Sequence, residues 1–292
     1  MKYISILIAV LVVSCGQARH KDSQPSTSVA DALADTSPEN NASISFTHDD
    51  LLRHDSLQID SLTPVMLAAV SNTLNKDSAH GLIKGSPDKS GQGIYATWDY
   101  GTLFSADKKH LLVRWRRGDY PEGYLVYSDI YLSKNDRLSK LVMDTAFLET
   151  TGDTLQDVNG DGYKDYVVSS YSGVGCCPRD AQVGYLYDNA TGDFKVESFF
   201  NPTYIPSQRL VYESNYGQTG LFAFYKSKWV GLEKVLVESI HPTPGKTPIE
   251  PAFPYTFMLF RYPGERTSII KAVPEEYKRL GLYEYFILYQ EQ

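Results

Sequence analysis

The sequence predicts a mainly β protein built from antiparallel hairpins. Short runs rich in β-branched and aromatic residues recur from about residue 91 onward, and polar turn segments separate them. The chain also holds 22 Tyr and 12 Phe, residue types that favour strands. We expect a β-propeller-like arrangement, with a sandwich or a barrel as alternatives, because each of these manages the edges of antiparallel sheets. One or two short peripheral helices complete the prediction.

Residues 1–14 have the pattern of an export signal. A basic start at Lys2 precedes the apolar stretch 4–13, which is too short to cross a bilayer comfortably. The stretch ends in Val12-Val13-Ser14-Cys15, which resembles the lipobox of bacterial lipoproteins. The resemblance implies cleavage before Cys15 and lipidation of Cys15, so we expect a lipid-anchored protein of the bacterial cell envelope that faces the periplasm or the cell surface. The alternative is an ordinary secretory signal with an incidental Cys.

Residues 15–50 are polar and poor in aromatic side chains. Such a segment buries too little apolar area to offset its ordering entropy, so we expect a disordered tether.

Residues 51–90 are expected to form a helical and linker segment. Thr63 has the character of an N-cap and Pro64 of a first helical residue, followed by Leu67, Val70 and Leu74 at helical spacing. A helix over 65–76 and a linker over 81–92 follow from this pattern.

Residues 91–292 are expected to form a β-rich domain that contains a calcium loop. The expected strands are 93–98, 111–115, 124–132, 138–148, 166–171, 183–187, 194–200, 221–225, 232–239, 255–262, 268–272 and 283–289. A strand–turn–strand pattern with an aromatic first strand repeats at 130–138, 185–194 and 222–232, and a short helix is expected at 274–280.

Residues 157–165 contain the best functional lead. Oxygen-bearing side chains alternate at Asp157, Asn159, Asp161 and Asp165, and a Gly occupies the sixth position. Calcium takes six to eight oxygen ligands, so a loop that binds it must turn tightly and direct every second side chain inward. Tyr163, at position seven, would contribute its backbone carbonyl. The spacing therefore predicts a Ca²⁺ site.

An EF-hand would place a bidentate Glu at position twelve, where this sequence has Val168. Because 166–171 is rich in β-branched and aromatic residues, we expect the loop to lead into a strand, with Asp165 as the closing carboxylate. A metal-independent hairpin turn is the alternative, since Asp, Asn and Gly also dominate turns. Three carboxylates within nine residues would repel one another without a cation, which favours the metal site.

Two adjacent cysteines, Cys176 and Cys177, lie between expected strands. In an oxidising envelope they can close a strained vicinal disulfide. Two thiols, one of them packed in the core, are an equally good interpretation.

The 157–165 loop with its following strand resembles the calcium loops of FG-GAP and VCBS-type repeats, which build β-propellers. A longer likeness covers 155–238, through 157–165, 175–180, 185–188 with 191–194, and Asn201-Pro202 followed by Arg209-Leu210. These segments resemble bacterial periplasmic lipoproteins that include lysozyme inhibitors and immunity proteins. The resemblance implies a non-enzymatic protein that binds and inhibits a lysozyme-like peptidoglycan hydrolase.

The formal net charge of −7 argues against nucleic acid as a partner and is compatible with a basic protein. Nucleophile-elbow, zinc-protease and phosphate-loop motifs are absent from the sequence, so we expect no enzymatic activity. Two other functions remain open. The first is an adhesion or surface-assembly module that binds glycan or protein. The second is a calcium-dependent hydrolase, in which Asp153 and Asp157 can act as an acid–base pair, although a role as ligands or loop supports suits them better.

Overall fold

The structure is a computed structural model that describes residues 48–85, 93–119, 124–135, 137–145, 150–171, 180–216, 222–243, 256–264, 266–280 and 283. The chain divides into two units, residues 1–45 and 46–292, and all the described elements belong to the second unit. In the described ranges this unit is mainly β and antiparallel, with a single α-helix, which confirms the predicted fold class.

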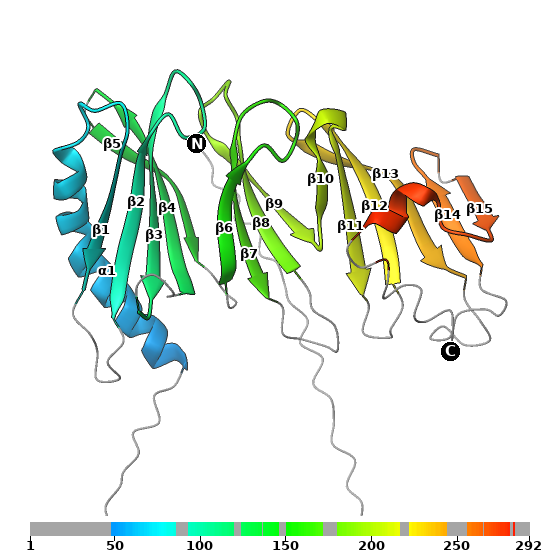
Figure 1. The fold of residues 1–292 in the computed structure, drawn as a ribbon, viewed down its shortest axis with the longest axis horizontal. Coiled ribbons are helices and arrows are strands. Elements are labelled where there is room, and N and C mark those ends of the chain that lie inside the picture. The colour runs from blue at the N-terminus through cyan, green and yellow to red at the C-terminus, as the bar shows by residue number, and fades with distance from the viewer. Residues whose placement is uncertain are drawn as a thin grey trace, which may run out of the picture. The chain divides into compact units, whose positions relative to one another are not determined.

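The strands form three sheets, and within each sheet they follow one another in sequence order (Figure 1). The first sheet contains β1 (Ala79–Lys84), β2 (Ile94–Gly101), β3 (Lys109–Arg117), β4 (Tyr124–Lys134) and β5 (Arg137–Thr145). The second contains β6 (Thr150–Gln156), β7 (Asp165–Tyr171), β8 (Asp180–Tyr187) and β9 (Phe194–Phe200). The third contains β10 (Thr203–Ile205), β11 (Leu210–Tyr216), β12 (Phe222–Val230), β13 (Glu233–Pro242), β14 (Phe257–Arg261) and β15 (Arg266–Ile270).

The three repeated strand–turn–strand patterns are confirmed, and each falls in a different sheet. They correspond to the hairpins β4–β5, β8–β9 and β12–β13. The sequence echo therefore marks one hairpin in each sheet. The structure does not show a propeller, and none of the three sheets closes into a barrel among the described strands.

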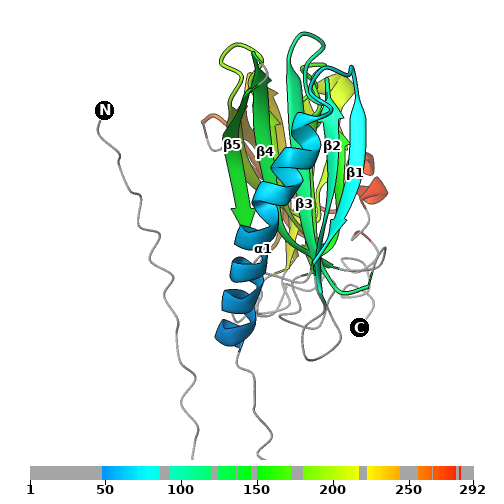
Figure 2. The same cartoon turned by 90° about the vertical axis from the view of Figure 1, so that its left-hand side faces the viewer.

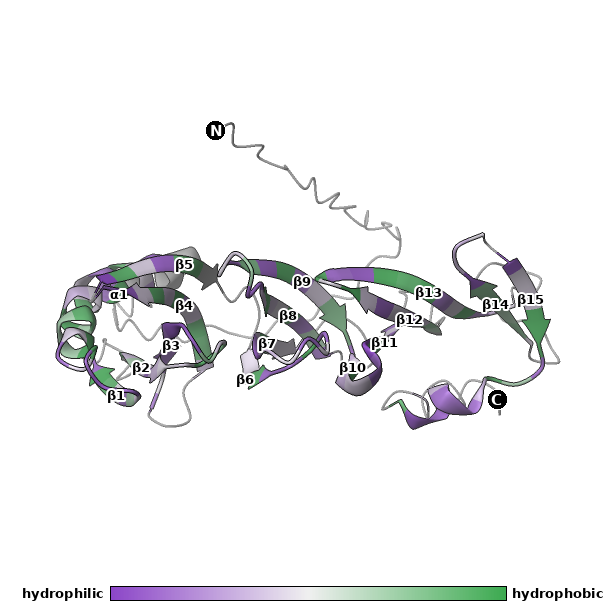
Figure 3. Cartoon of the chain, turned by 90° about the horizontal axis from the view of Figure 1, so that it is seen from above, coloured by the Kyte–Doolittle hydropathy of each residue, from purple (hydrophilic) through white to green (hydrophobic). Residues whose placement is uncertain are grey.

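The second sheet packs against its neighbours with both faces. Tyr166 and Val168 of β7 are buried with Leu112 of the first sheet, whereas Val167 is buried with Trp229 of the third sheet. Successive residues of a strand point to opposite faces, so the continuous apolar run in β7 is the pattern of a strand covered on both sides. Figure 3 shows polar and apolar residues in bands along the other strands.

A helix covers the outer face of the first sheet. In α1 (His48–Ser71), Ile59, Met66 and Val70 pack against that sheet (Figure 2). The prediction of an N-cap at Thr63 is wrong, because Thr63 and Pro64 lie inside the helix and the Thr63 hydroxyl donates to the Ile59 carbonyl (2.7 Å).

Tertiary contacts explain the earlier start of this helix. The Asp55 carboxylate, almost fully buried, pairs with the Arg117 guanidinium of β3. This contact and the packing of Ile59 stabilise turns whose own sequence is polar, and local pattern reasoning does not include such contacts.

The outer face of the third sheet is covered by the 3₁₀-helix η2 (Glu275–Arg279), whose Tyr277 is buried. This element confirms the short helix expected at 274–280. A second 3₁₀-helix, η1 (Pro206–Gln208), links β10 to β11.

Sequence reasoning missed four strands: β1, β6, β10 and β11. β1 and β6 are only partly buried, so neither shows an apolar run, and part of β1 falls in the predicted linker 81–92. The strand expected at 283–289 lies outside the described residues except at Tyr283.

Candidate metal centre

The acidic loop, residues 157–165, joins β6 to β7. Its polar side chains turn back onto the loop's own backbone. Asp157 accepts from the N–H groups of Gly160 (2.6 Å) and Gly162 (2.9 Å), Asn159 accepts from Asp161 (3.0 Å), and Asp161 accepts from Tyr163 (2.9 Å). These bonds show that the polar side chains stabilise a tight turn.

Two glycines allow this turn, but only one of them is also confined by its surroundings. Gly160 has φ +75° and Gly162 has φ +91°, a region that side-chain-bearing residues rarely adopt. A Cβ added at Gly160 would lie 2.1 Å from the Pro206 carbonyl oxygen of η1, whereas a Cβ at Gly162 would meet nothing within 4 Å. Arg209 Nε also donates to the Gly160 carbonyl (3.2 Å). The acidic loop is thus held against the third sheet at Gly160.

Asp165 connects the acidic loop to the interior of the second sheet. Its side chain is buried and accepts from the Val158 N–H (2.9 Å) and from the Tyr187 N–H at the end of β8 (2.9 Å). Burial raises the pKa of Asp165 to about 7; the two N–H donors oppose this shift, and the negative charges of Asp161 and Asp157 add to it. A cation at this position would favour the ionised form.

The donor set fits calcium in its chemistry. Asp157, Asp161 and Asp165 provide carboxylate oxygens, Asn159 an amide oxygen and Tyr163 a backbone carbonyl, and all of these are the hard donors that calcium prefers. In the described ranges, three or more His, Cys, Asp or Glu side chains are nowhere gathered as a metal site. The loop carboxylates instead accept backbone hydrogen bonds, which leaves further lone pairs on their oxygens.

Position twelve behaves as the sequence predicts. Val168 lies within β7, and its buried side chain packs in the apolar cluster between the first and second sheets. The loop therefore leads into a strand and not into the second helix of an EF-hand.

Asp153 does not belong to the acidic loop. Its carboxylate pairs with the guanidinium groups of Arg114 and Arg116 on β3, and Arg114 also pairs with Asp99 (2.5 Å). This ion-pair network joins the first and second sheets. The interpretation of Asp153 as a support of the loop is wrong, because its charge is satisfied by two arginines that are remote in the sequence.

Three residues outside the loop contact it, and the sequence analysis predicted none of these contacts. They are Tyr187, Pro206 and Arg209. Each is at least 22 residues from its loop partner, so no local spacing marks it. The predicted lipidation site Cys15 and the pair Cys176 and Cys177 lie outside the described residues. No helix in the described part of the chain is long and apolar enough to cross a membrane.

Comparisons with known proteins identify no family. No protein-family profile matches the chain, and no curated protein matches it. One solved structure, described as a Xanthomonas type IV secretion system related protein, aligns over 66% of this chain and 100% of its own length at 14% identity, with a TM-score of 0.32. A likeness at that score supports no conclusion about fold or function.

Proposed function

We propose that this chain is a lipid-anchored, calcium-binding protein of the bacterial cell envelope that acts by binding another protein, and that its partner is a lysozyme-like peptidoglycan hydrolase, which it inhibits. The observation that carries the calcium part is the spacing of oxygen-bearing side chains in the acidic loop, Asp157, Asn159, Asp161 and Asp165, on a turn that two glycines with positive φ allow. The Cys15 lipobox pattern supports the anchor, and the resemblance over 155–238 supports the partner.

The role proposed for calcium is structural. The acidic loop contacts η1 through Gly160 and reaches β8 through Asp165, so an ion there would stabilise the second sheet and its junction with the third. Extracellular calcium modules work at dissociation constants near 10⁻⁴ to 10⁻³ M, which suits a site that stays filled outside the cell.

Calcium binding is tested by thermal and denaturant unfolding of the full chain in EGTA and in saturating calcium. At about one hundred times the Kd, calcium should add roughly 2.7 kcal/mol to the free energy of unfolding. Asp161→Ala should abolish this gain. Asp188→Ala is the matched control, because Asp188 caps the β8–β9 turn through similar bonds to Ala190 and Thr191 but lies outside the loop. Equal stability with EGTA and calcium would contradict the proposal.

Exposed apolar side chains on β9 support a protein-binding role. β9 is the last strand of the second sheet, and Val196 and Phe200, on the same face of β9, are 57% and 44% exposed. Exposed apolar residues beside a sheet edge are typical of interaction surfaces. An acidic protein would also be attracted to a basic hydrolase, which would speed their association.

Inhibition is tested by measuring peptidoglycan hydrolysis by a panel of lysozyme-like enzymes with the full chain added. The chain should slow hydrolysis by a cognate enzyme, and Phe200→Asp should weaken this inhibition. Ile269→Asp is the control and should not weaken it, because Ile269 is 69% exposed but lies on the edge strand β15. Binding of an envelope glycan or protein without any effect on the panel would favour the adhesion function. Turnover of muropeptides by the chain itself would favour the hydrolase.

We also propose that the three sheets are blade-like units related to those of propellers. Each is an antiparallel meander packed on the next, and the outer faces of the first and third sheets are covered by α1 and η2. An open stack of blades with helical covers accounts for both the repeated hairpins and the lack of closure among the described strands. An experimental structure of the full chain that places these sheets in a closed ring would contradict the open stack.

A further inference from the structure

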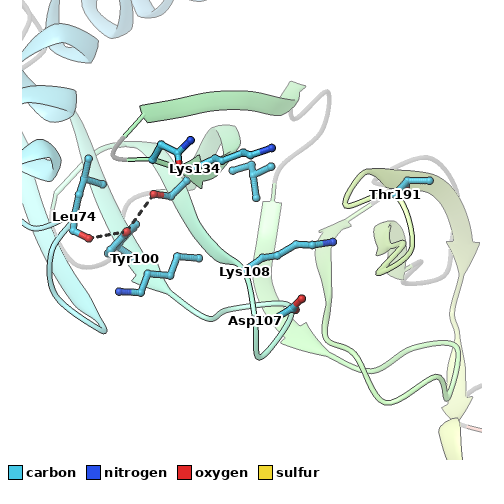
Figure 4. A pocket seen from close by; sticks show the side chains of 10 residues that line it. Leu74, Tyr100, Asp107, Lys108, Lys134 and Thr191 are labelled. Carbon is cyan, nitrogen blue, oxygen red and sulfur yellow. Dashed lines mark hydrogen bonds between the residues drawn. The ribbon is translucent and has the colours of Figure 1, made fainter.

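A pocket lies where the turns of the first sheet approach the β8–β9 turn of the second (Figure 4). Its volume is about 570 Å³, within the range of sites that hold small molecules. We call it the lysine pocket. Its lining residues are Leu74, Tyr100, Asp107, Lys108, Lys109, Leu132, Ser133, Lys134, Asn135 and Thr191.

The lysine pocket is positively charged although the chain carries a net charge of −7. Its lining includes three lysines and one carboxylate, that of Asp107. Asp107 is exposed and accepts from the Ser105 hydroxyl. Asp77 approaches Lys109 at 3.5 Å, but its side chain is fully exposed, so solvent screens the pair. The local charge therefore favours an anion.

Two of the lysines are positioned by contacts with other elements. Lys108 Nζ donates to the Asn189 carbonyl in the β8–β9 turn (3.0 Å) and lies 5.9 Å from the centre of the Tyr187 ring. Figure 4 shows Lys108 extending toward the turn that carries Thr191. Lys109 Nζ donates to the Lys76 carbonyl (2.7 Å) and lies 5.9 Å from the centre of the Tyr100 ring. Each ammonium keeps donors beyond the one used here.

The rest of the lining suits a ligand with both polar and apolar parts. The Tyr100 hydroxyl is bonded to the Leu74 carbonyl (3.0 Å) and to the Ser133 hydroxyl (3.2 Å), so this wall has a defined arrangement. Leu74 and Leu132 add apolar surface, and Lys134 stands exposed at the end of β4.

We propose that the lysine pocket binds a phosphorylated small molecule or headgroup, with Lys108, Lys109 and Lys134 contacting its phosphoryl oxygens. Lys108 and Lys109 are consecutive residues where β3 begins, and Lys134 is the last residue of β4. Ammonium groups act on an anion as point charges, which suits a tetrahedral phosphoryl group. A planar carboxylate is matched better by the forked guanidinium of Arg, and the lining residues that the structure describes include no Arg. This proposal does not depend on calcium or on a hydrolase partner.

The test is calorimetric titration of the full chain in EGTA with pyrophosphate, glucose 1-phosphate and glucose. Both phosphate compounds should bind saturably, more weakly as salt is raised, and glucose should not bind. Lys134→Met should weaken binding about tenfold, since a hydrogen bond to a charged group contributes about 1.5 kcal/mol or more. Lys228→Met is the matched control: Lys228 is also an exposed strand lysine, but it lies on β12 and outside the pocket lining.

Flotation of the Cys15→Ser chain, which cannot carry the proposed lipid anchor, with phosphatidylglycerol vesicles separates the two sources of phosphate. Binding of glucose 1-phosphate without binding to vesicles supports a soluble ligand, and vesicle binding that Lys134→Met weakens more than Lys228→Met supports a lipid headgroup. No saturable binding of any of these probes, or equal losses in the two lysine variants, would overturn the proposal.

Discussion

The acidic loop and the lysine pocket are both polar sites beside the second sheet, but they are assembled in different ways. The loop is one continuous segment whose carboxylates accept hydrogen bonds from four N–H groups of the loop itself. The pocket combines side chains from the turn after α1, from β2 and the β2–β3 connection, from the β4–β5 hairpin and from the β8–β9 turn. Changes in the loop should therefore alter stability, whereas changes in the pocket should alter binding alone.

The largest effect is expected at Asp165. Asp165→Ala leaves the buried N–H groups of Val158 and Tyr187 without acceptors, at about 1–3 kcal/mol each, so the free energy of unfolding should fall by roughly 2–6 kcal/mol in EGTA. Asp165→Asn keeps one acceptor oxygen, so its free energy of unfolding should fall by about half as much. Denaturant unfolding measures both, and similar small losses in the two variants would contradict the anchoring role of this carboxylate.

Alanine substitutions at the two loop glycines distinguish the cost of backbone strain from the cost of a clash with η1. Gly162→Ala introduces only the strain of a positive φ, so we expect a loss of about 1 kcal/mol. Gly160→Ala adds a clash with the Pro206 carbonyl and should cost about 3 kcal/mol in chemical denaturation. Equal losses of unfolding free energy in the two variants would mean that the loop does not pack closely against η1 at Gly160.

His110 should make stability depend on pH. It is buried beside Phe104 and Tyr187, and burial lowers its pKa to about 4. The backbone of Lys108 and the charge of Asp107 oppose this shift, and the ammonium charge of Lys108 adds to it. Between about pH 6.5 and pH 4 the unfolded chain binds a proton here that the folded chain does not. Stability contributed by the neutral ring is therefore present above pH 6.5 and is lost as the pH falls toward 4.

This loss should reach about 3 kcal/mol at pH 4, because each pKa unit corresponds to about 1.4 kcal/mol. His110→Phe removes the titrating group from the same cluster and should flatten the acid limb of a plot of unfolding free energy against pH. An unchanged slope in this variant would show that other groups cause the acid sensitivity.

The smallest effect is expected at the lysine pocket. Lys134→Met removes an exposed side chain, so the free energy of unfolding should change by less than about 0.5 kcal/mol, as in Lys228→Met. A loss of several kcal/mol at Lys134 would remove the contrast between the two sites and make the pocket part of the folding core.

The prediction from sequence succeeded where a local pattern carries the information. The hairpins β4–β5, β8–β9 and β12–β13 repeat an aromatic strand and a polar turn, and η2 follows a Pro. The prediction failed where an element is stabilised by contacts with distant parts of the chain. α1 begins at His48 because Asp55 and Ile59 find partners on the first sheet, and β6 is a strand because β7 pairs with it, although its own sequence is polar.

The sequence by itself determined the β class, the repeated hairpins and the turn of the acidic loop, because side chains spaced two residues apart and glycines at fixed positions act over a few bonds. Three features could be seen only in the tertiary structure. The loop contacts η1 at Gly160, Asp153 forms ion pairs with two arginines of β3, and three lysines line one pocket. These depend on how separate strands pack, and the charge, burial and partner of each side chain are set by residues far from it in the sequence.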